Sequence, residues 1–327
     1  MPGAANHLTV PTVLVPRHRP IRLLGRGGMG EVWLAERVSD VGASKLVALK
    51  LMTFGIASEE NYATFLQEAR VSMSMNHPNI VQVFDAGVHD GRAWLDLEYV
   101  EGVDLARVAT SLRTNRHLPS ETAVVHLARS LLRALAHAHG LRSAPGGAGV
   151  VHRDVSPQNI LVGHHGQLKL NDFGVARVVE AVPSATSPVG KVRYMPPEQA
   201  AGRVGPQSDL FGAGAVLHEL LEGQKFRGHI PQAGMLRAAF DGVVAPISRP
   251  ISPALHQLLT GLVCPDPRQR FQSAEAALAF MDQHSLLADA SQEWAALSKS
   301  TPVAAPSPAP PFDNFESSLS GDPTEHG

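Results

Sequence analysis

Two short stretches constrain what this chain can fold into more than any other feature. The first, residues 151–159, contains Asp154 and, five positions later, Asn159; the second, residues 171–174, contains Asp172. The carboxylate of Asp154 can accept a proton from a hydroxyl, while the amide oxygen of Asn159 and the carboxylate of Asp172 can hold a metal ion. The two aspartates are 18 positions apart and follow the patterns H-R-D-x-x-x-x-N and D-F-G. That order and spacing is typical of a phosphoryl-transfer site.

Length and composition fit a globular enzyme. The chain has 327 residues, of which 44% are apolar and 18% charged, which suits about two domains or one bilobal unit. The net charge of −2 does not indicate a nucleic-acid partner. No run approaches the roughly 20 apolar residues of a membrane span, and the N-terminus lacks a signal-peptide pattern, so we expect a soluble cytoplasmic protein. Cys264 is the one cysteine, which excludes an internal disulfide and suggests a small core residue.

The first third of the chain is patterned mainly for strands. Residues 1–19 contain proline and scattered small residues and are expected to form a flexible arm. Residues 21–52 alternate short apolar runs with a glycine cluster, which predicts strand, turn and strand. Residues 59–75 predict a helix, and residues 81–84 and 93–97 predict two strands joined by a hairpin turn at Asp90-Gly91.

The remainder is patterned mainly for helices. Residues 120–139 carry apolar side chains at helical spacing with Ser120 as N-cap, and further helices are predicted at 208–221 and 273–281. Residues 285–327, rich in Pro, Ser and Ala, are expected to be a disordered tail. A strand-rich half followed by a helix-rich half predicts an α+β chain with two lobes.

Residues 24–32 fit the glycine-rich pattern G-x-G-x-x-G-x-V. Gly25, Gly27 and Gly30 would let the backbone approach phosphate oxygens and offer amide donors. The alternatives are a glycine-rich hairpin turn and a Rossmann dinucleotide site. Strand patterns on both sides argue against the Rossmann alternative, and the motif lacks the G-K-[ST] ending of a P-loop.

Lys50 ends a Val-Ala-Leu-Lys segment, residues 47–50, in the manner of a strand lysine that reaches the α- and β-phosphates. It needs a carboxylate to hold it, and Glu68 on the helix at 59–75 is the candidate. The alternatives are a snorkelling lysine and a solvated glutamate.

Together these motifs resemble the eukaryote-like (Hanks-type) serine/threonine protein kinases of bacteria, over about residues 20–284. The resemblance implies a bilobal protein-kinase-like fold: a small antiparallel β-sheet lobe with one helix (20–100) and a larger, mainly helical lobe (101–284). It also implies a signalling enzyme that uses ATP and Mg²⁺ to phosphorylate Ser and Thr hydroxyls of proteins, including its own activation segment.

The resemblance further assigns nucleotide contacts. Backbone groups of Glu98 and Val100 would hydrogen-bond adenine, and Leu97 would be the gatekeeper. The full implied set of ATP-binding residues is Leu24, Gly25, Gly27, Gly30, Val32, Ala48, Lys50, Glu68, Leu97, Glu98, Val100 and Leu161. Asp154 would act as catalytic base, and Asn159 and Asp172 would hold Mg²⁺.

Supporting positions follow from the same resemblance. Residues 194–199 resemble an A-P-E element with Pro196 in place of alanine. Glu198 would pair with Arg270, and Asp209 would fix the catalytic loop from a buried helix. A purely architectural role is the alternative for all three.

The segment 175–195 would be the activation segment. Its hydroxyls Ser184, Thr186 and Ser187 are candidates for a phosphate that Arg153 would bind, with Thr186 favoured. The alternative is an unmodified loop.

The chain departs from the family pattern at three further positions. Ser156 stands where the family usually has lysine, and Lys191 stands where it usually has threonine. We hypothesise that Lys191 supplies the catalytic positive charge that Ser156 lacks; the alternative is an exposed lysine and a weaker enzyme. Ser72 stands where an apolar side chain usually packs towards Phe173 and His152, so the helix is expected to need help from phosphorylation or a partner.

Two other functional classes remain open. A pseudokinase would bind nucleotide and act as a scaffold, which Ser156 and Ser72 would favour. A small-molecule phosphotransferase is disfavoured by residues 195–198, which in the family form a ledge for peptide docking. No arginine lies between Ser156 and Asn159, where tyrosine kinases have one, so serine/threonine specificity is expected.

Overall fold

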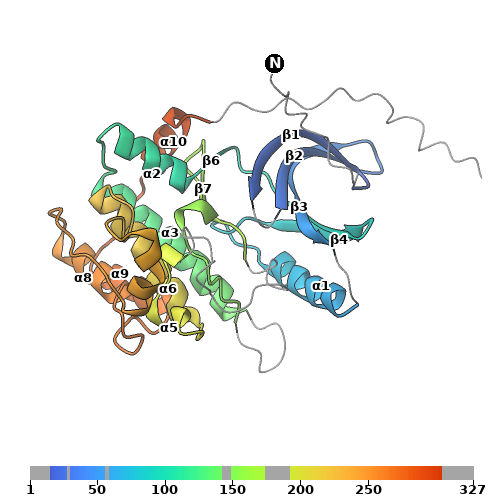
Figure 1. Cartoon of the computed structure of the whole chain (residues 1–327). Coiled ribbons are helices and arrows are strands. Elements are labelled where there is room, and N and C mark those ends of the chain that lie inside the picture. The colour runs from blue at the N-terminus through green and yellow to red at the C-terminus, as the bar shows by residue number, and fades with distance from the viewer. Residues whose placement is uncertain (1–14, 28–29, 56–58, 142–148, 174–191, 304–327) are drawn as a thin grey trace, which may run out of the picture. The chain divides into compact units, whose positions relative to one another are not determined.

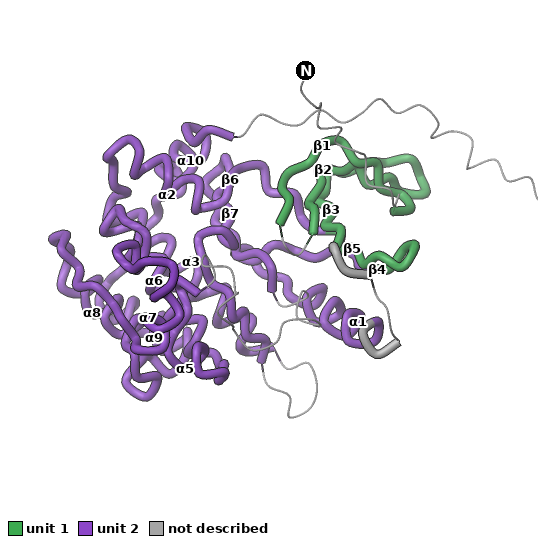
Figure 2. The backbone as a smooth tube through the Cα atoms, in the orientation of Figure 1, with its two compact units in different colours: residues 1–56, 87–96, 305–327 green, residues 57–86, 97–304 purple. Residues whose placement is uncertain are grey.

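The computed structural model describes residues 15–27, 30–55, 59–141, 149–173 and 192–303. Contacts divide the chain into two units, which Figure 2 colours separately. One unit comprises residues 1–56, 87–96 and 305–327, and the other comprises residues 57–86 and 97–304.

A five-stranded sheet has the order β1-β2-β3-β5-β4; most of it belongs to the first unit, while residues 83–86 of β4 and 97–98 of β5 belong to the second. Its strands are β1 (His18–Gly27), β2 (Gly30–Val38), β3 (Ser44–Gly55), β4 (Val83–His89) and β5 (Arg92–Glu98) (Figure 1). β1, β2 and β3 form an antiparallel meander, as the sequence pattern predicts. Asp90 and Gly91 connect β4 to β5 with φ values of 47° and 72°, the left-handed backbone of a tight hairpin turn.

The prediction that residues 1–19 form a flexible arm is wrong for the last residues of that range. β1 begins at His18, and both Val15 and His18 are buried. The amide of Val38 donates to the carbonyl of Arg17 over 2.9 Å, which ties this segment to the end of β2. The proline-rich composition therefore hid the start of an edge strand.

The second unit is mainly helical. Its helices include α1 (Glu59–Ser74), α2 (Leu105–Thr114), α3 (Glu121–Gly140), α5 (Pro197–Ala200), α6 (Pro206–Glu222), α7 (Met235–Phe240), α8 (Pro253–Leu262), α9 (Ala274–Gln283) and α10 (Ser291–Ser300). A small sheet of β6 (Gly102–Asp104), β7 (Ile160–Gly163) and β8 (Leu168–Leu170) lies beside them, with short 3₁₀ turns at η1 (Pro157–Asn159) and η3 (Gln232–Gly234). No helix in these described ranges is long and apolar enough to cross a membrane.

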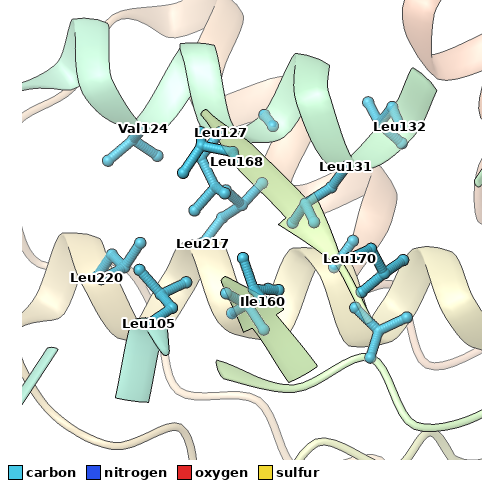
Figure 3. Packing of buried hydrophobic residues seen from close by; sticks show 14 of the residues in the cluster. Leu105, Val124, Leu127, Leu131, Leu132, Ile160, Leu168, Leu170, Leu217 and Leu220 are labelled. Carbon is cyan, nitrogen blue, oxygen red and sulfur yellow. The ribbon is translucent and has the colours of Figure 1, made fainter. Parts of the chain in front are cut away.

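The core of this unit lies between α3, α6 and the small sheet. Figure 3 shows Leu127 and Leu131 of α3 packing near Leu217 of α6 and Ile160 of β7. Ser120 caps α3 as the sequence predicts, because its hydroxyl accepts from the amide of Ala123 over 3.0 Å. A capped, densely packed helix pair is a rigid base for the loops that precede β7 and follow β8.

The prediction of a disordered tail over residues 285–327 is wrong for the start of that range. Residues 291–300 form α10, and Trp294 on that helix is completely buried. Its indole Nε1 donates to the carbonyl of Ala123 over 3.1 Å, and the Ser298 hydroxyl donates to the carbonyl of Val162 over 2.7 Å. The composition of the last 40 residues is polar and proline-rich as a whole, so the apolar anchor near its start was overlooked.

Candidate active site

The stretch 151–159, here called the catalytic loop, lies between α3 and β7 and is fastened to α6 by Asp209. The buried carboxylate of Asp209 accepts from the amides of His152, at 2.7 Å, and Arg153, at 2.6 Å. It also lies 2.8 Å from Nε2 of His139. Arg153 adopts a left-handed φ of 67°, an uncommon backbone conformation for a residue with a side chain. The two amide bonds from His152 and Arg153 to Asp209 hold the loop in this conformation, as the resemblance implied.

Gly212 on α6 allows the loop to lie directly on that helix. A Cβ atom at this position would approach Val155 Cβ to 2.9 Å and the Val155 carbonyl to 3.0 Å. Any larger residue would therefore push the catalytic loop off α6.

Asn159 connects the two diagnostic stretches. Its side-chain Nδ2 donates to the carbonyl of Asp154 over 2.7 Å, and its own carbonyl accepts from the amide of Asn171 over 2.8 Å. Because Nδ2 is engaged inside the loop, the amide oxygen is the atom that remains to face a cation. The carboxylate of Asp154 and this amide therefore belong to one rigid turn.

His152 makes a second connection. Its Nδ1 accepts from the amide of Asp154 at 3.2 Å, and its Nε2 donates to the carbonyl of Asn171 at 2.7 Å. These roles require the neutral imidazole with the proton on Nε2. The ring also packs edge-on against Phe173, with centroids 4.6 Å apart.

Asp172 lies between these contacts with a left-handed φ of 62° and an exposed side chain. The carbonyl before it is held by His152, and the carbonyl after it, that of Phe173, accepts a hydrogen bond from the buried hydroxyl of Ser72 over 3.3 Å. Ser72 was expected to leave this position short of contacts. It instead contributes a polar contact from α1 to the segment that carries Asp172.

In the first unit, the predicted phosphate-binding residues lie on β1, β2 and β3. Val32 on β2 is the register partner of Lys50 on β3, and Lys50 is buried. Gly27 pairs with Gly30 at the end of the β1–β2 hairpin. Gly30 has φ of 149°, and a Cβ there would lie 2.1 Å from the Leu51 carbonyl, so this position requires glycine. The remaining predicted residues of this unit are Leu24 and Gly25 on β1 and Ala48 on β3.

In the second unit, Leu97 is buried at the end of β5, and Glu98 follows it. The Glu98 carboxylate pairs with Lys169 at 2.9 Å, and its amide donates to the carbonyl of Gln82 over 2.8 Å. The amide is therefore occupied, and the group that Glu98 can offer to adenine is its carbonyl. Val100 follows β5, and Leu161 lies half-buried on β7.

The predicted pair of Lys50 and Glu68 stays a prediction. Lys50 belongs to the first unit, while Glu68 on α1 belongs to the second.

The predicted pair of Glu198 and Arg270 is confirmed. Two guanidinium nitrogens of Arg270 lie 2.6 Å and 3.2 Å from the two carboxylate oxygens of Glu198, and both side chains are buried. Arg270 also donates to the carbonyls of Cys264, Gln207 and Pro265. This bidentate pair fastens α5 to the turn before α9.

Sequence reasoning missed a buried polar cluster around Glu219 of α6. Its carboxylate accepts from Arg113 at 2.9 Å, from the Tyr194 hydroxyl at 2.6 Å and from the amide of Phe226 at 3.0 Å. Burial, reinforced by Glu219, raises the pKa of Tyr194 well above its usual range, so the hydroxyl stays a donor. A glutamate inside the apolar run 210–221 was the signal available in the sequence.

Several predicted residues lie outside the described ranges. These are Lys191, Gly174 and the candidate phosphorylation sites Ser184, Thr186 and Ser187. Ser156, which lacks the usual lysine side chain, is described and buried.

Comparison with known proteins agrees with this geometry. The family model for the protein kinase domain matches residues 19–280. The serine/threonine-protein kinase PrkC of Bacillus subtilis is 32% identical over 79% of this chain and 39% of its own length. The serine/threonine-protein kinase pkn3 of Myxococcus xanthus is 33% identical over 80% of this chain and 48% of its own length.

One similar protein carries a different specificity in its name. The tyrosine-protein kinase MasK of Myxococcus xanthus is 31% identical over 80% of this chain and 43% of its own length. This chain therefore spans less than half the length of each of these relatives.

Proposed function

Because this chain belongs to the protein kinase domain family, we propose that it transfers the γ-phosphoryl group of ATP to serine and threonine hydroxyls of proteins. One observation carries the proposal. Asn159 bonds to the Asp154 carbonyl through its side chain and to the Asn171 amide through its backbone. This places the base-bearing turn and the Asp172 segment in direct contact, as phosphoryl transfer requires.

Asp154 is the residue that acts on the acceptor. Its half-buried carboxylate projects from a turn fixed by His152 and Asn159, where it would accept the hydroxyl proton and orient the oxygen in line with the γ-phosphorus. Such orientation and proton acceptance each contribute on the order of 10²-fold or more to the rate.

The donor set fits Mg²⁺. The amide oxygen of Asn159 and the carboxylate of Asp172 are hard oxygen ligands, and Mg²⁺ usually takes only one or two carboxylates together with substrate phosphates. When bound, the metal ion would neutralise charge on the phosphate oxygens. The contribution of the chain is to fix both ligands through the Asn159–Asn171 bond.

The remaining roles concern nucleotide binding. Gly25, Gly27 and Gly30 would present amides to the phosphates, and Lys50, paired with Glu68, would reach the α- and β-phosphates. Leu24, Val32, Ala48, Leu97 and Leu161 would enclose the adenine, which would bond to the backbone of Glu98 and Val100.

The proposal also includes a catalytic role for Lys191 in place of the lysine that the family usually has at the position of Ser156. Residue 156 is a buried serine, which carries a hydroxyl, so the catalytic loop itself supplies no ammonium group at this position. Lys191 would supply it. Lys191→Ala should lose most activity, and the double variant Ser156→Lys, Lys191→Thr should recover it; full activity in Lys191→Ala would end this part of the proposal.

We also propose that residues 20–284 form the catalytic domain and that it acts in the cytoplasm, where ATP is available. Its partners would be proteins with accessible Ser or Thr. The first substrate of the kinase would be its own activation segment, with Thr186 as the favoured site. Arg153 would bind the phosphate on that residue.

Incubation of the purified chain with Mg-ATP, followed by mass spectrometry and phosphoamino-acid analysis, tests the proposed function. Transfer to Ser or Thr of the chain itself or of casein supports it. Nucleotide binding without transfer would instead support the pseudokinase alternative, and transfer to a small molecule alone would support the third class. Phosphotyrosine alone would overturn the serine/threonine specificity.

A further inference from the structure

Arg227 is a buried cation that the proposed chemistry does not use. It lies in the turn between α6 and η3, its relative exposure is 3%, and its backbone has a left-handed φ of 54°. The guanidinium packs over two aromatic rings, with its central carbon 5.6 Å from the Phe211 centroid and 5.1 Å from the Phe226 centroid.

Two of its three hydrogen bonds go to residues at the end of the proposed activation segment. Nη1 donates to the carbonyls of Arg193, at 3.1 Å, and Met195, at 2.9 Å. Nε donates to the carbonyl of Val243, at 2.8 Å. Arg193 returns the contact, because its Nη1 donates to the carbonyl of Phe226 over 2.9 Å. The two arginines therefore interlock the backbones of residues 193–195 and 226–227.

No carboxylate pairs with Arg227 within the part of the chain that the structure describes, and its Nη2 is buried without a hydrogen-bond partner. Burial, together with the nearby Arg193, lowers the pKa of Arg227 to about 10, so the side chain is still charged at neutral pH. A buried charge without a counter-ion is expensive, and here three hydrogen bonds to backbone carbonyls and two ring contacts offset that cost. Two of those carbonyls belong to residues 193 and 195, so the side chain fixes the backbone of that segment.

The segment held by Arg227, residues 192–196, is here called the docking ledge; it overlaps the start of residues 195–198, to which the family resemblance assigns peptide docking. Val192 and Met195 pack on Met235 and Ala239 of α7 in a small apolar cluster that is separate from the main core. The apolar cluster therefore holds the side chains of this segment, and Arg227 holds its carbonyls. A segment that binds an extended peptide needs such fixed backbone, because the peptide is recognised through backbone geometry as well as through side-chain pockets.

We propose that Arg227 is a positioning residue that sets the affinity and sequence preference for the peptide around the accepting hydroxyl, by holding the docking ledge in one conformation. The inference deepens the proposed function and rests on it. It concerns protein-substrate binding alone, because Arg227 contacts none of Asp154, Asn159 and Asp172 in the described structure.

The test compares Arg227→Lys and Arg227→Met with the wild type. Lysine keeps the charge but lacks the planar fork that reaches three carbonyls, and methionine keeps only the apolar stem. With a positional-scanning library of Ser and Thr peptides, we expect both variants to raise the peptide KM roughly tenfold, which corresponds to the loss of about one hydrogen bond. The residue preference around the acceptor should flatten, while the ATP KM and peptide-independent ATP hydrolysis should change less than about twofold.

Two further variants keep the test decisive. Arg193→Met removes the reciprocal bond from a half-buried side chain, so it should fold even if Arg227 variants do not, and it should shift peptide KM in the same direction. Arg237→Lys is the matched control, because Arg237 is exposed and, among the residues that the structure describes, forms its ion pair with Asp241 four positions later. It should leave every parameter unchanged.

The outcomes separate this inference from the proposed function. If the wild type transfers no phosphate to any peptide or protein, the proposed function fails. If the wild type is active and the Arg227 and Arg193 variants have wild-type peptide KM and preference, the role of Arg227 is overturned. A parallel loss of peptide transfer and of peptide-independent ATP hydrolysis would also overturn it, since that result indicates general structural damage.

Discussion

The hydroxyl of Ser72 on α1 donates a hydrogen bond to the carbonyl of Phe173, 3.3 Å away and 101 residues later in the chain. The contact is buried, and Phe173 directly follows Asp172, the proposed metal ligand. His152 holds the carbonyl on the other side of Asp172. The carbonyls of Asn171 and Phe173, the residues on either side of Asp172, are therefore each held by a side chain from a separate element.

Ser72→Ala should lower kinase activity roughly tenfold, because it leaves a buried carbonyl without its donor and loosens the Asp172 segment. The loss should be partly relieved by raised Mg²⁺, which a simple stability defect would not show. Ser74→Ala is the matched control, since Ser74 is exposed on the same helix and its hydroxyl donates only to the Val71 carbonyl. Wild-type Mg²⁺ dependence in Ser72→Ala would contradict this role.

Glu198→Gln should destabilise the second unit by about 3–5 kcal/mol, because it leaves the guanidinium of Arg270 buried without its charge partner. Urea unfolding monitored by tryptophan fluorescence would measure the change. Arg268→Gln is the control: it breaks an exposed pair with Asp266 two residues away and should leave the unfolding midpoint unchanged. Equal urea midpoints for the wild type, Glu198→Gln and Arg268→Gln would show that the buried pair does not stabilise the fold.

Stability should fall as the pH drops below about 6.5, in part through His126 on α3. Burial lowers the pKa of His126, against the opposing effect of Asp289 and with a smaller contribution from Arg133. The neutral ring is required, because its Nδ1 accepts from the amide of Ala290 at 2.7 Å. Its contribution is thus complete above the ordinary histidine pKa and is lost as the pH falls through the lowered value.

Thermal unfolding between pH 8 and pH 5 checks this sign. His126→Asn should be less stable than the wild type at pH 8, and the difference should shrink at pH 5. His165→Asn, at an exposed position, should follow the wild type throughout. A difference that grows on acidification would mean that the charged form of His126 stabilises the fold.

Trp294→Ala should cost about 3–5 kcal/mol, because this completely buried ring anchors α10. Trp294→Phe should cost less, since it keeps most of the apolar contact and loses mainly the bond to the Ala123 carbonyl, worth about 1 kcal/mol. Denaturant titration of the two variants gives both values. A wild-type midpoint for Trp294→Ala would restore the expectation that this region is a dispensable tail.

Much of the scaffold was predictable because its signals are local. The helix at α3 has strong apolar periodicity and a serine cap at Ser120, and the hairpin between β4 and β5 has an Asp-Gly turn. The site stretches were predictable because Asp154, Asn159 and Asp172 lie close together in sequence. Glu198 and Arg270 are 72 positions apart, and only the family resemblance paired them.

The rest depended on contacts between distant residues. Strands β6 and β8 are only three residues each, too short for periodicity to be read. The burial of Trp294 depends on α3, more than 150 residues earlier in the chain, so the composition of its own neighbourhood suggested disorder. The sequence offered no signal for the burial of Arg227 for the same reason, since the carbonyls that it binds belong to residues 193, 195 and 243.

The initial rate of phosphoryl transfer by Asp154→Asn, measured with Mg-ATP and compared with the wild type, tests the central claim most directly. Asparagine preserves the shape of the side chain but cannot accept the proton, so we expect transfer to casein and to the chain itself to fall by 10²-fold or more. ATP binding should be unchanged. Equal rates for Asp154→Asn and the wild type would contradict the account.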